Sequence, residues 1–199
     1  MEFEVESPCE DPDIKLVTFG RFSDARGVFS ELYRREVFEA LGVPGDFAQD
    51  SASRSSRNVI RGLHLQPRPL MGKLVRVVRG RALLVARNVS RGSPYFGGAF
   101  GIELTGDDLT WVWAPGWHAR GYLALEDDTE VYYKGTAEYA PHSDVGIQWH
   151  DPTMTALRGS RTDDLWPVSN PVVSERDRTA PLLREALDLG ILEFDEVDS

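Results

Sequence analysis

Cysteine is nearly absent from this chain of 199 residues, because Cys9 is the only one, and no intrachain disulfide can therefore form. Histidine is scarce too: of the four histidines, no two are spaced as His-x-His, and no Cys-x-x-Cys pair occurs. The chain thus lacks a local metal-binding motif, and a three-histidine site would need distant residues to converge. We expect no bound metal.

No stretch approaches the roughly 20 apolar residues of a membrane-spanning helix, so we expect no membrane segment.

Two catalytic motifs are also missing. The chain has neither a G-x-S-x-G nucleophile elbow nor a complete phosphate-binding loop, since Gly97-Gly98 lacks the rest of that pattern. Its first residues, 1–6, are acidic without an apolar run, so we expect no signal peptide. A single cysteine fits a reducing compartment, and we expect a cytoplasmic protein. The net charge of −10 and a pI near 4.9 argue against nucleic acid as a partner.

One internal segment lacks acidic residues altogether. Residues 51–102 contain ten Lys or Arg and no Asp or Glu, a local charge of +10, which leaves −20 for the rest of the chain (−10 minus +10). A positive stretch inside an acidic protein indicates a local anion site. His64 lies near its centre, in Arg61-Gly62-Leu63-His64. The segment can therefore hold a phosphate-bearing ligand beside a titratable base.

Many short apolar runs separated by turn residues predict an all-β domain over residues 1–199, a sandwich, jelly roll or barrel. We expect loose tails at 1–12 and 193–199, short helices at 35–41 and 181–189, and a long loop at 150–180. The expected strands cover residues 14–19, 28–33, 47–51, 58–65, 73–78, 82–89, 100–104, 109–113, 120–125 and 129–134.

Acid–base chemistry is the most promising function that these residue types allow. His64 could act as a base, or be a barrel-lining histidine satisfied by a backbone carbonyl. Tyr133 and Tyr139 could be general acids, stack on a base, or simply fill the core. Lys73, Arg61 and Arg26 could hold phosphates, but any one of them alone is better explained as a solvated surface residue.

Ordered motifs link these residues. The chain resembles the dTDP-4-dehydrorhamnose 3,5-epimerase family in the following segments: Phe22-x-Asp24-x-Arg26-Gly27-x-Phe29-x-Glu31, Gln49-Asp50-Ser51-x-Ser53-x-Ser55, Val59-Ile60-Arg61-Gly62-Leu63-His64-Leu65-Gln66, Gly72-Lys73-Leu74-Val75-Arg76, Tyr133-Lys134-x-Thr136-x-x-Tyr139-x-Pro141, Gly146-Ile147-x-Trp149-x-Asp151-Pro152 and Ser174-Glu175-Arg176-Asp177. Each motif is weak alone, but their joint order and spacing carry the resemblance.

The resemblance implies a cupin-type jelly roll with a few peripheral helices, working as a homodimer without metal or cofactor. The implied reaction is epimerisation at C3 and/or C5 of a dTDP-linked 4-keto-6-deoxyhexose in deoxysugar biosynthesis. The ketone at C4 acidifies the neighbouring C–H groups, so one base and one acid can invert a centre through an enolate.

The same resemblance assigns roles to residues. It implies that His64 is the base, that Asp177 orients it, that Tyr133 is the acid on the other face, and that Lys73 stabilises charge on the C4 oxygen. The expected substrate-binding residues are Arg26, Glu31, Gln49, Ser51, Arg61, Arg120, Tyr139 and Arg176. Among these, Arg61 and Gln49 are expected at the diphosphate, Tyr139 near the sugar or base, and Arg26 and Glu31 at the nucleotide of the neighbouring subunit.

Two segments depart from the family pattern. Arg120 occupies the place of a histidine near the sugar, with His118 two residues earlier, and Leu84 and Asn88 stand where two aspartates are usual. An arginine stays protonated at neutral pH, so it cannot shuttle a proton there, but it could bind the C4 oxygen or an extra anionic group.

These departures could be harmless variation in a tolerant pocket, or they could alter the outcome of the reaction. Three alternatives to a 3,5-epimerase stay open. The enzyme could act at one centre only, at C3 or at C5. The chain could be a sugar-nucleotide-binding cupin without turnover, although retention of a base and an acid argues against a pure binder. A metal-dependent cupin oxygenase is the most distant alternative.

Overall fold

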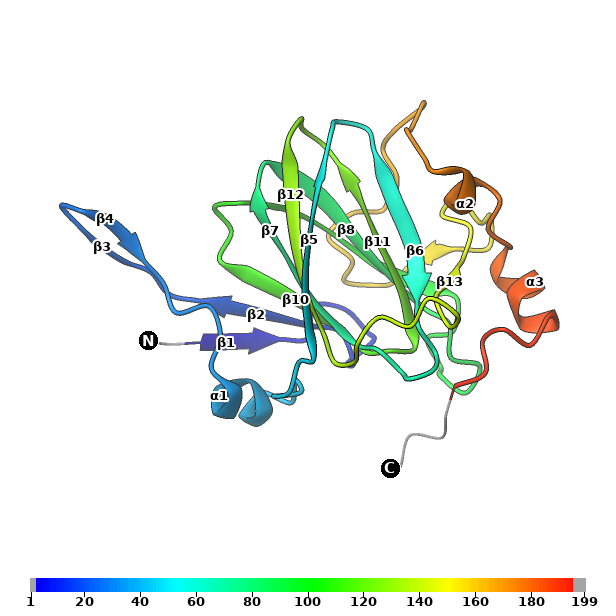
Figure 1. Ribbon diagram of the computed structural model, residues 1–199, viewed down its shortest axis with the longest axis horizontal. Helices are drawn as coiled ribbons and strands as arrows, with labels where there is room; N and C mark the ends of the chain where they lie inside the picture. Colours follow the sequence, from blue (N-terminus) through cyan, green and yellow to red (C-terminus); the bar gives the residue numbers. More distant parts are fainter. Residues whose placement is uncertain (1–2, 195–199) are drawn as a thin grey trace.

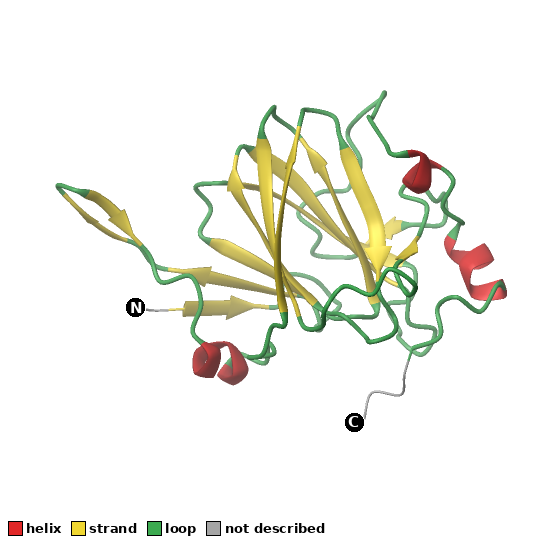
Figure 2. Ribbon diagram, viewed as in Figure 1, coloured by secondary structure: helices red, strands yellow, loops and turns green. Residues whose placement is uncertain are grey.

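Two six-stranded sheets face each other and form the body of the molecule (Figures 1 and 2). The computed structural model describes residues 3–194. The first sheet has the strand order β1-β2-β10-β7-β12-β5 and the second β13-β6-β11-β8-β9-β14. The strands are β1 Phe3–Glu6, β2 Lys15–Phe19, β3 Phe22–Asp24, β4 Gly27–Phe29, β5 Gln49–Ser55, β6 Ile60–Leu65, β7 Lys73–Arg79, β8 Arg81–Asn88, β9 Gly98–Thr105, β10 Thr110–Ala114, β11 His118–Ala124, β12 Thr129–Gly135, β13 Val145–Gly146 and β14 Thr155–Ala156.

The main core lies between the sheets. Strand alternation sends one side chain in two toward this space, so Leu84 and Ala86 of β8 pack there while Leu83 and Val85 face the other way. The second set belongs to another core, on the outer face of the second sheet, which includes Leu183 of helix α3 (Leu183–Asp188). Because β8 has apolar cover on both faces, its run of apolar residues is almost continuous.

The outer face of the first sheet carries a third core. Trp111 of β10 is fully buried there against Phe38, the buried residue of helix α1 (Arg35–Ala40). The remaining helix, α2 (Glu175–Arg178), is a single turn close to β6. The few short helices therefore cover the outsides of the sheets and leave the interior to the strands.

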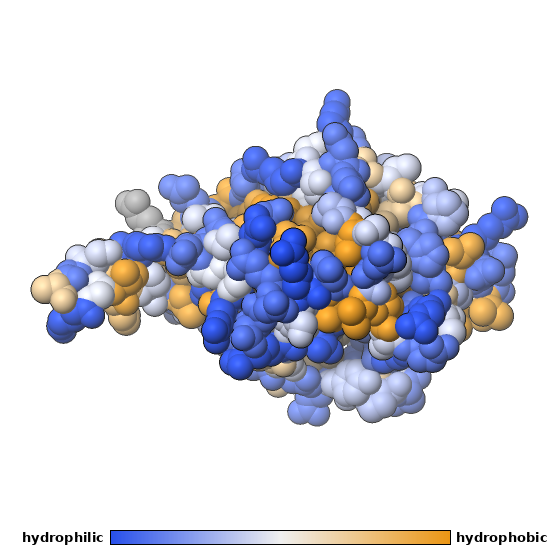
Figure 3. All heavy atoms as spheres, turned by 90° about the horizontal axis from the view of Figure 1, so that it is seen from above, coloured by the Kyte–Doolittle hydropathy of each residue, from blue (hydrophilic) through white to orange (hydrophobic). Residues whose placement is uncertain are grey.

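A two-stranded arm projects from the body. Strands β3 and β4 pair only with each other among the described strands, and Figures 1 and 3 show the arm extending away from the sheets. Phe22, Val28 and Phe29 on this arm are 60%, 59% and 68% exposed. Three apolar side chains so open to water suggest that another surface covers them.

The strand-rich architecture confirms the predicted all-β class, and four local predictions were wrong. The segment expected to be a long loop at 150–180 contains β14, which pairs with β9, and helix α2. The strand expected at 28–33 ends at Phe29, because the arm offers no further partner strand. The strand expected at 47–51 runs from Gln49 to Ser55 along the edge of the first sheet. The lead-in expected to be loose contains β1, which pairs with β2, and a fully buried Asp11. Of the predicted C-terminal tail, residues 195–199 lie outside the described residues.

Across residues 3–194, no helix combines the length and apolar character needed to cross a bilayer.

Candidate active site

A cavity of about 720 Å³ lies between the two sheets. Part of its lining is apolar, from side chains that include Leu84, Phe100 and Val112. The structure also brings to its wall ten of the residues predicted from the sequence: His64, Lys73, Tyr133, Asp177, Gln49, Ser51, Arg61, Arg120, Tyr139 and Arg176. The cavity thus combines an apolar wall with convergent polar groups, as ligand sites usually do.

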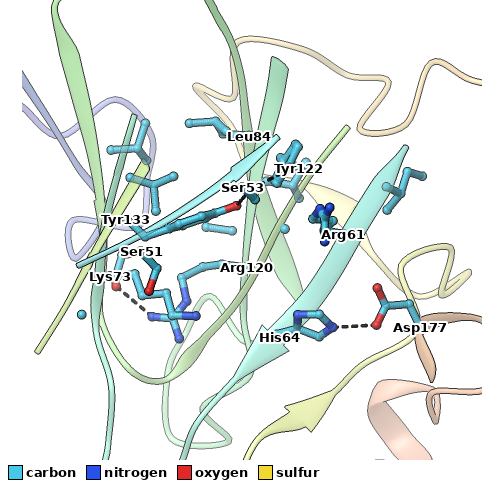
Figure 4. Close-up of a pocket in the computed structure, with 18 of the residues that line it drawn as sticks. Ser51, Ser53, Arg61, His64, Lys73, Leu84, Arg120, Tyr122, Tyr133 and Asp177 are labelled. Carbon is cyan, nitrogen blue, oxygen red and sulfur yellow. Dashed lines mark hydrogen bonds and ion pairs between the residues drawn. The ribbon is translucent and has the colours of Figure 1, made fainter. Parts of the chain in front are cut away.

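His64 and Asp177 form a hydrogen-bonded pair on one side of this cavity (Figure 4). The Nε2 atom of His64 lies 2.6 Å from Oδ1 of Asp177, and Oδ2 accepts a 3.2 Å hydrogen bond from the Gly62 amide. Burial opposes the charge on Asp177, but its hydrogen bonds, above all the one with His64, prevail and lower its pKa below the usual value. The imidazole is therefore held by a charged carboxylate through Nε2, which leaves Nδ1 for the cavity.

Asp177 owes its position to the start of α2. The Ser174 hydroxyl caps this single turn by accepting a hydrogen bond from the Asp177 amide at 3.1 Å. The two partners of the pair are 113 residues apart in sequence. Packing of α2 against β6 is what brings them together.

An irregularity in β6 places Arg61 and His64 in the same cavity. Residues three apart in a regular strand point to opposite faces, yet both line the cavity. The register between β6 and β11 shifts between Arg120 and Tyr122, opposite Gly62, whose φ is +118°. A Cβ on Gly62 would lie 2.7 Å from the Arg120 carbonyl oxygen. Only glycine fits this bulge, which changes the phase of the strand.

Tyr133 reaches the cavity from β12, in the opposite sheet (Figure 4). Its hydroxyl lies 2.6 Å from the Ser53 hydroxyl of β5, which is also 2.9 Å from the Tyr122 hydroxyl. Burial is the main cause that raises the pKa of Tyr133, and the neighbouring Tyr122 adds to it. The phenol is therefore protonated at neutral pH and can donate.

Lys73 and Arg120 place two positive charges together on the cavity wall away from Asp177 (Figure 4). Burial, with the charge of Arg120 second, lowers the pKa of Lys73 to about 8. The Arg120 Nη1 atom donates to the carbonyls of Ala114 and Pro115 at 3.1 and 3.0 Å. Its Nε and Nη2 atoms are buried without a hydrogen-bond partner among the described residues. Buried donors of this kind are costly unless a ligand or water satisfies them.

The remaining predicted residues form a polar rim. The Gln49 side chain donates to the Ser51 hydroxyl at 3.0 Å and accepts from the Tyr139 amide at 2.7 Å. Arg176 forms a 2.7 Å ion pair with Asp144, whose carboxylate also accepts from the Tyr139 hydroxyl at 3.0 Å. Sequence reasoning missed Asp144, since it lies in a loop beside the matched motifs.

Arg26 and Glu31 do not reach this cavity. Arg26 lies at the tip of the arm and pairs with Asp24 of the same hairpin at 2.6 Å. Glu31 follows β4 and forms an ion pair with Arg34. Neither lines the cavity of its own chain.

The positions of His118 and of Asn88, one of the departures from the family pattern, have a structural explanation. His118 does not line the cavity. Its Nε2 atom lies 3.0 Å from Asp11 Oδ2, and the Asn88 amide donates to the same oxygen at 2.8 Å. All three residues are fully buried. They fasten the N-terminal segment to the second sheet, so Asn88 supplies a donor where a carboxylate would face Asp11 with a like charge.

No three or more His, Cys, Asp or Glu residues within 3–194 are grouped so that they could hold a metal ion.

Comparison with known proteins assigns the chain to a family. The sequence profile of the dTDP-4-dehydrorhamnose 3,5-epimerase family matches residues 9–185. The chain belongs to this family. A dTDP-4-dehydrorhamnose 3,5-epimerase from Pseudomonas aeruginosa is 39% identical over 177 residues, 88% of this chain and 93% of that protein. A dTDP-4-dehydrorhamnose 3-epimerase from Streptomyces niveus is 33% identical over 172 residues, 85% of this chain and 79% of that protein.

The fold of this family member is also shared with solved structures. The dTDP-6-deoxy-D-glucose-3,5-epimerase from Legionella pneumophila, in complex with dTDP-4-keto-L-rhamnose, has a TM-score of 0.86 and 31% identity, covering 98% of this chain and 100% of that one. The predicted family, cupin-type fold and isomerase class are thereby confirmed.

Proposed function

We propose that this epimerase inverts C3 and C5 of a dTDP-linked 4-keto-6-deoxyhexose. The observation that supports this most is the pairing of His64 with Asp177 at 2.6 Å on one side of a cavity that Tyr133 enters from the opposite sheet. Epimerisation beside a ketone needs a base on one face of the sugar and an acid on the other. The relatives supply the substrate class, since they are named for dTDP-4-dehydrorhamnose.

In the proposed reaction, His64 takes the proton from the carbon next to C4. The C–H bond breaks, its electron pair forms a carbon–carbon double bond to C4, and the carbonyl pair moves onto the C4 oxygen. Asp177 stabilises the imidazolium that results. The pair on the C4 oxygen then re-forms the carbonyl, and the carbon–carbon double-bond pair takes a proton from Tyr133 on the other face. This new C–H bond inverts the centre and leaves a phenolate on Tyr133. The ketone of the substrate is the electron sink, and we propose that no cofactor takes part.

Lys73 and Arg120 are the groups that we propose for the C4 oxygen. Both are cations on one wall of the cavity. The Nε and Nη2 atoms of Arg120 have no hydrogen-bond acceptor among the described residues, so a ligand oxygen could accept from them. An enolate oxygen is the negatively charged acceptor that these donors do not have in the free protein. Donors preorganised around a developing oxyanion are usually a large contribution to catalysis.

The rim residues are proposed to bind the nucleotide. Arg61 and Gln49 are assigned to the diphosphate, with Ser51 and Arg176 as further polar contacts, and Tyr139 is assigned to the sugar or base. Arg61 comes from the acid-free segment, and its charge suits the diphosphate.

We also propose a homodimer in which each arm covers the partner subunit. The exposed Phe22, Val28 and Phe29 would be buried by a second copy, and Arg26 and Glu31 would then reach its nucleotide. Replacement of Phe29 by Asp should yield monomers in sedimentation experiments with weaker dTDP binding. Monomeric wild-type protein with full dTDP affinity would contradict the dimer.

Cys9 is free, which supports a reducing compartment and a proposed cytoplasmic location.

Epimerisation at a single centre is the second candidate. It is supported by the Streptomyces niveus relative, which is named a 3-epimerase. It is also supported by Arg120 and Leu84, which stand in the cavity in place of the usual histidine and aspartate. Binding without turnover is less well supported, because a binder has no use for a held base and a protonated phenol.

Incubation with dTDP-4-keto-6-deoxyglucose in heavy water, followed by NMR, tests the proposal. We expect deuterium at C3 and C5 and an epimerised product; uptake at one carbon alone would select the single-centre enzyme. Absence of uptake at both carbons, with the sugar nucleotide bound, would falsify the assignment for this substrate.

A further inference from the structure

Four hydroxyl groups and one guanidinium form a continuous chain of hydrogen bonds that ends at Tyr133. Tyr133 contacts Ser53 at 2.6 Å, Ser53 contacts Tyr122 at 2.9 Å, and Tyr122 contacts Ser55 at 2.8 Å. The chain begins at Arg61, whose Nε donates to the Ser55 hydroxyl at 3.0 Å. Its members come from both sheets, and Figure 4 shows the part from Tyr133 to Tyr122.

The direction of this chain follows from its hydrogens and from the charge at its start. Each hydroxyl has one hydrogen to donate, and a guanidinium can only donate. Three contacts join the four hydroxyls, so one of the four hydroxyl hydrogens is left over. Ser55 and Tyr122 are only 5% and 2% exposed, and a spare hydrogen is costly in a buried place, so it belongs to Ser53 or Tyr133, which both line the cavity. In both cases Ser55 donates to Tyr122 and Tyr122 to Ser53. A hydroxyl that accepts a hydrogen bond is a stronger donor, and the positive Arg61 polarises the chain away from itself, which favours donation from Ser53 to Tyr133.

We propose that Ser55, Tyr122 and Ser53 are positioning residues: their polarised chain favours donation from Ser53 to Tyr133, so that Tyr133 presents its own hydrogen to the bound sugar. The inference rests on the proposed function, in which Tyr133 is the acid. Without the links from Arg61 through Ser55 and Tyr122, nothing would favour this direction, and a phenol that donates to Ser53 turns its hydrogen away from the reacting carbon.

The chain also stabilises the product of the proton transfer. When Tyr133 protonates the carbon, its O–H bond breaks, the C–H bond forms, and the electron pair stays on the phenolate oxygen. Ser53 already donates to that oxygen, and the positive Arg61 polarises the whole chain toward it. Burial raises the pKa of Tyr133, so a donor to the phenolate lowers the cost of forming it. Solvent returns a proton to the phenolate before the next turnover.

Tyr122→Phe removes one link and keeps the ring, which makes it the test variant. Two rates are measured in heavy water with dTDP-4-keto-6-deoxyglucose: deuterium uptake into unreacted substrate, which needs only the base, and formation of inverted product, which also needs the acid. We expect Y122F to lower inversion about tenfold, as the loss of one hydrogen bond should, while uptake into substrate continues. Tyr132→Phe is the matched control, because it removes the neighbouring phenol, which hydrogen-bonds Asp50 at 2.7 Å and does not line the cavity.

Tyr133→Phe sets the limit of the effect. If the chain acts through Tyr133, Y122F should lower inversion no further in a Y133F background. Ser53→Ala should reproduce Y122F and serves if that variant fails to fold. Equal loss of uptake and inversion, no loss of either, or a further loss in the double variant would overturn the proposal. Wild-type protein without any uptake would instead overturn the proposed function.

Discussion

Two pairs of ionisable residues in the cavity differ in where their hydrogen-bonding and charge partners lie. His64 and Asp177 are complete within the protein, since both oxygens of the carboxylate accept hydrogen bonds. Lys73 and Arg120 are two cations together, and two donor atoms of Arg120 lack partners among residues 3–194. The carboxylate of Asp144 raises the pKa of Lys73 only against larger opposing effects, and it is itself held by Arg176. The base is therefore preorganised in the free protein, whereas the cationic pair gains its counter-charge from a ligand.

Removal of the base should have the largest effect. We expect His64→Asn to slow deuterium uptake at both carbons on the order of 10⁴-fold, because the other residues cannot replace a positioned general base. The exposed His142→Asn is the matched control and should leave both rates unchanged. Uptake by H64N within tenfold of the wild type would show that another group takes the proton.

Removal of Lys73 should lower activity and raise stability. Lys73→Met should slow uptake by about 10²- to 10³-fold, through the loss of oxyanion stabilisation. It should also raise the free energy of unfolding at neutral pH by roughly 1–3 kcal/mol, because the lowered pKa of Lys73 means that its protonated form opposes folding. Wild-type stability should rise between pH 8 and 10.5 as folded Lys73 loses its proton.

The control for this pair of effects is Lys134→Met. Lys134 ion-pairs with Asp50 at 2.7 Å and does not line the cavity. Its replacement should leave uptake intact and should not stabilise the fold. A K73M protein less stable than the wild type would mean that Lys73 is already paired in the free enzyme.

Loss of Arg120 should shift the pH at which deuterium uptake falls. If the ammonium form of Lys73 is active, uptake by the wild type should fall as pH rises through about 8. Arg120→Met removes a positive neighbour, so the fall should move to higher pH, with a rate about tenfold lower at neutral pH. Arg76→Met, a buried arginine packed over Phe19 and Trp111 outside the cavity, is the control. An unmoved limit in R120M would separate Arg120 from Lys73.

The smallest effect is expected in acid. The pKa of Asp177 lies below its ordinary value of 3.8, so the charged carboxylate adds stability above that pH, and the stability is lost as pH falls through the folded value. Thermal unfolding between pH 6 and pH 2 should show a shallower loss for Asp177→Asn than for the wild type. Parallel curves would place the acid sensitivity elsewhere.

The local part of the site could be predicted from the sequence. The acid-free segment placed His64, Lys73 and Arg61 together, and the ordered motifs added Tyr133 and Asp177. Each of these residues lines the cavity. The strands that carry His64, Arg61, Lys73 and Tyr133 were also found, because apolar runs between turn residues are a local signal. Helix α2, which carries Asp177, was not found, since it is a single turn inside the segment expected to be a loop.

What depends on distant contacts could not be predicted. The bulge at Gly62 exists only against β11, and the neighbours Ser53 and Tyr122 are 69 residues apart in sequence. The expected loose N-terminal segment is held by His118 and Asn88, whose partner Asp11 no local pattern reveals. The strand predicted beyond Phe29 was wrong for a similar reason, since a strand requires a partner to pair with.

The two-faced reaction is tested most directly by comparing H64N and Y133F in one heavy-water experiment. The account predicts that H64N loses both deuterium uptake into substrate and inversion, while Y133F keeps uptake and loses inversion. If Y133F instead abolishes uptake, or H64N retains it, His64 is not the base facing an acid at Tyr133, and the central claim is contradicted.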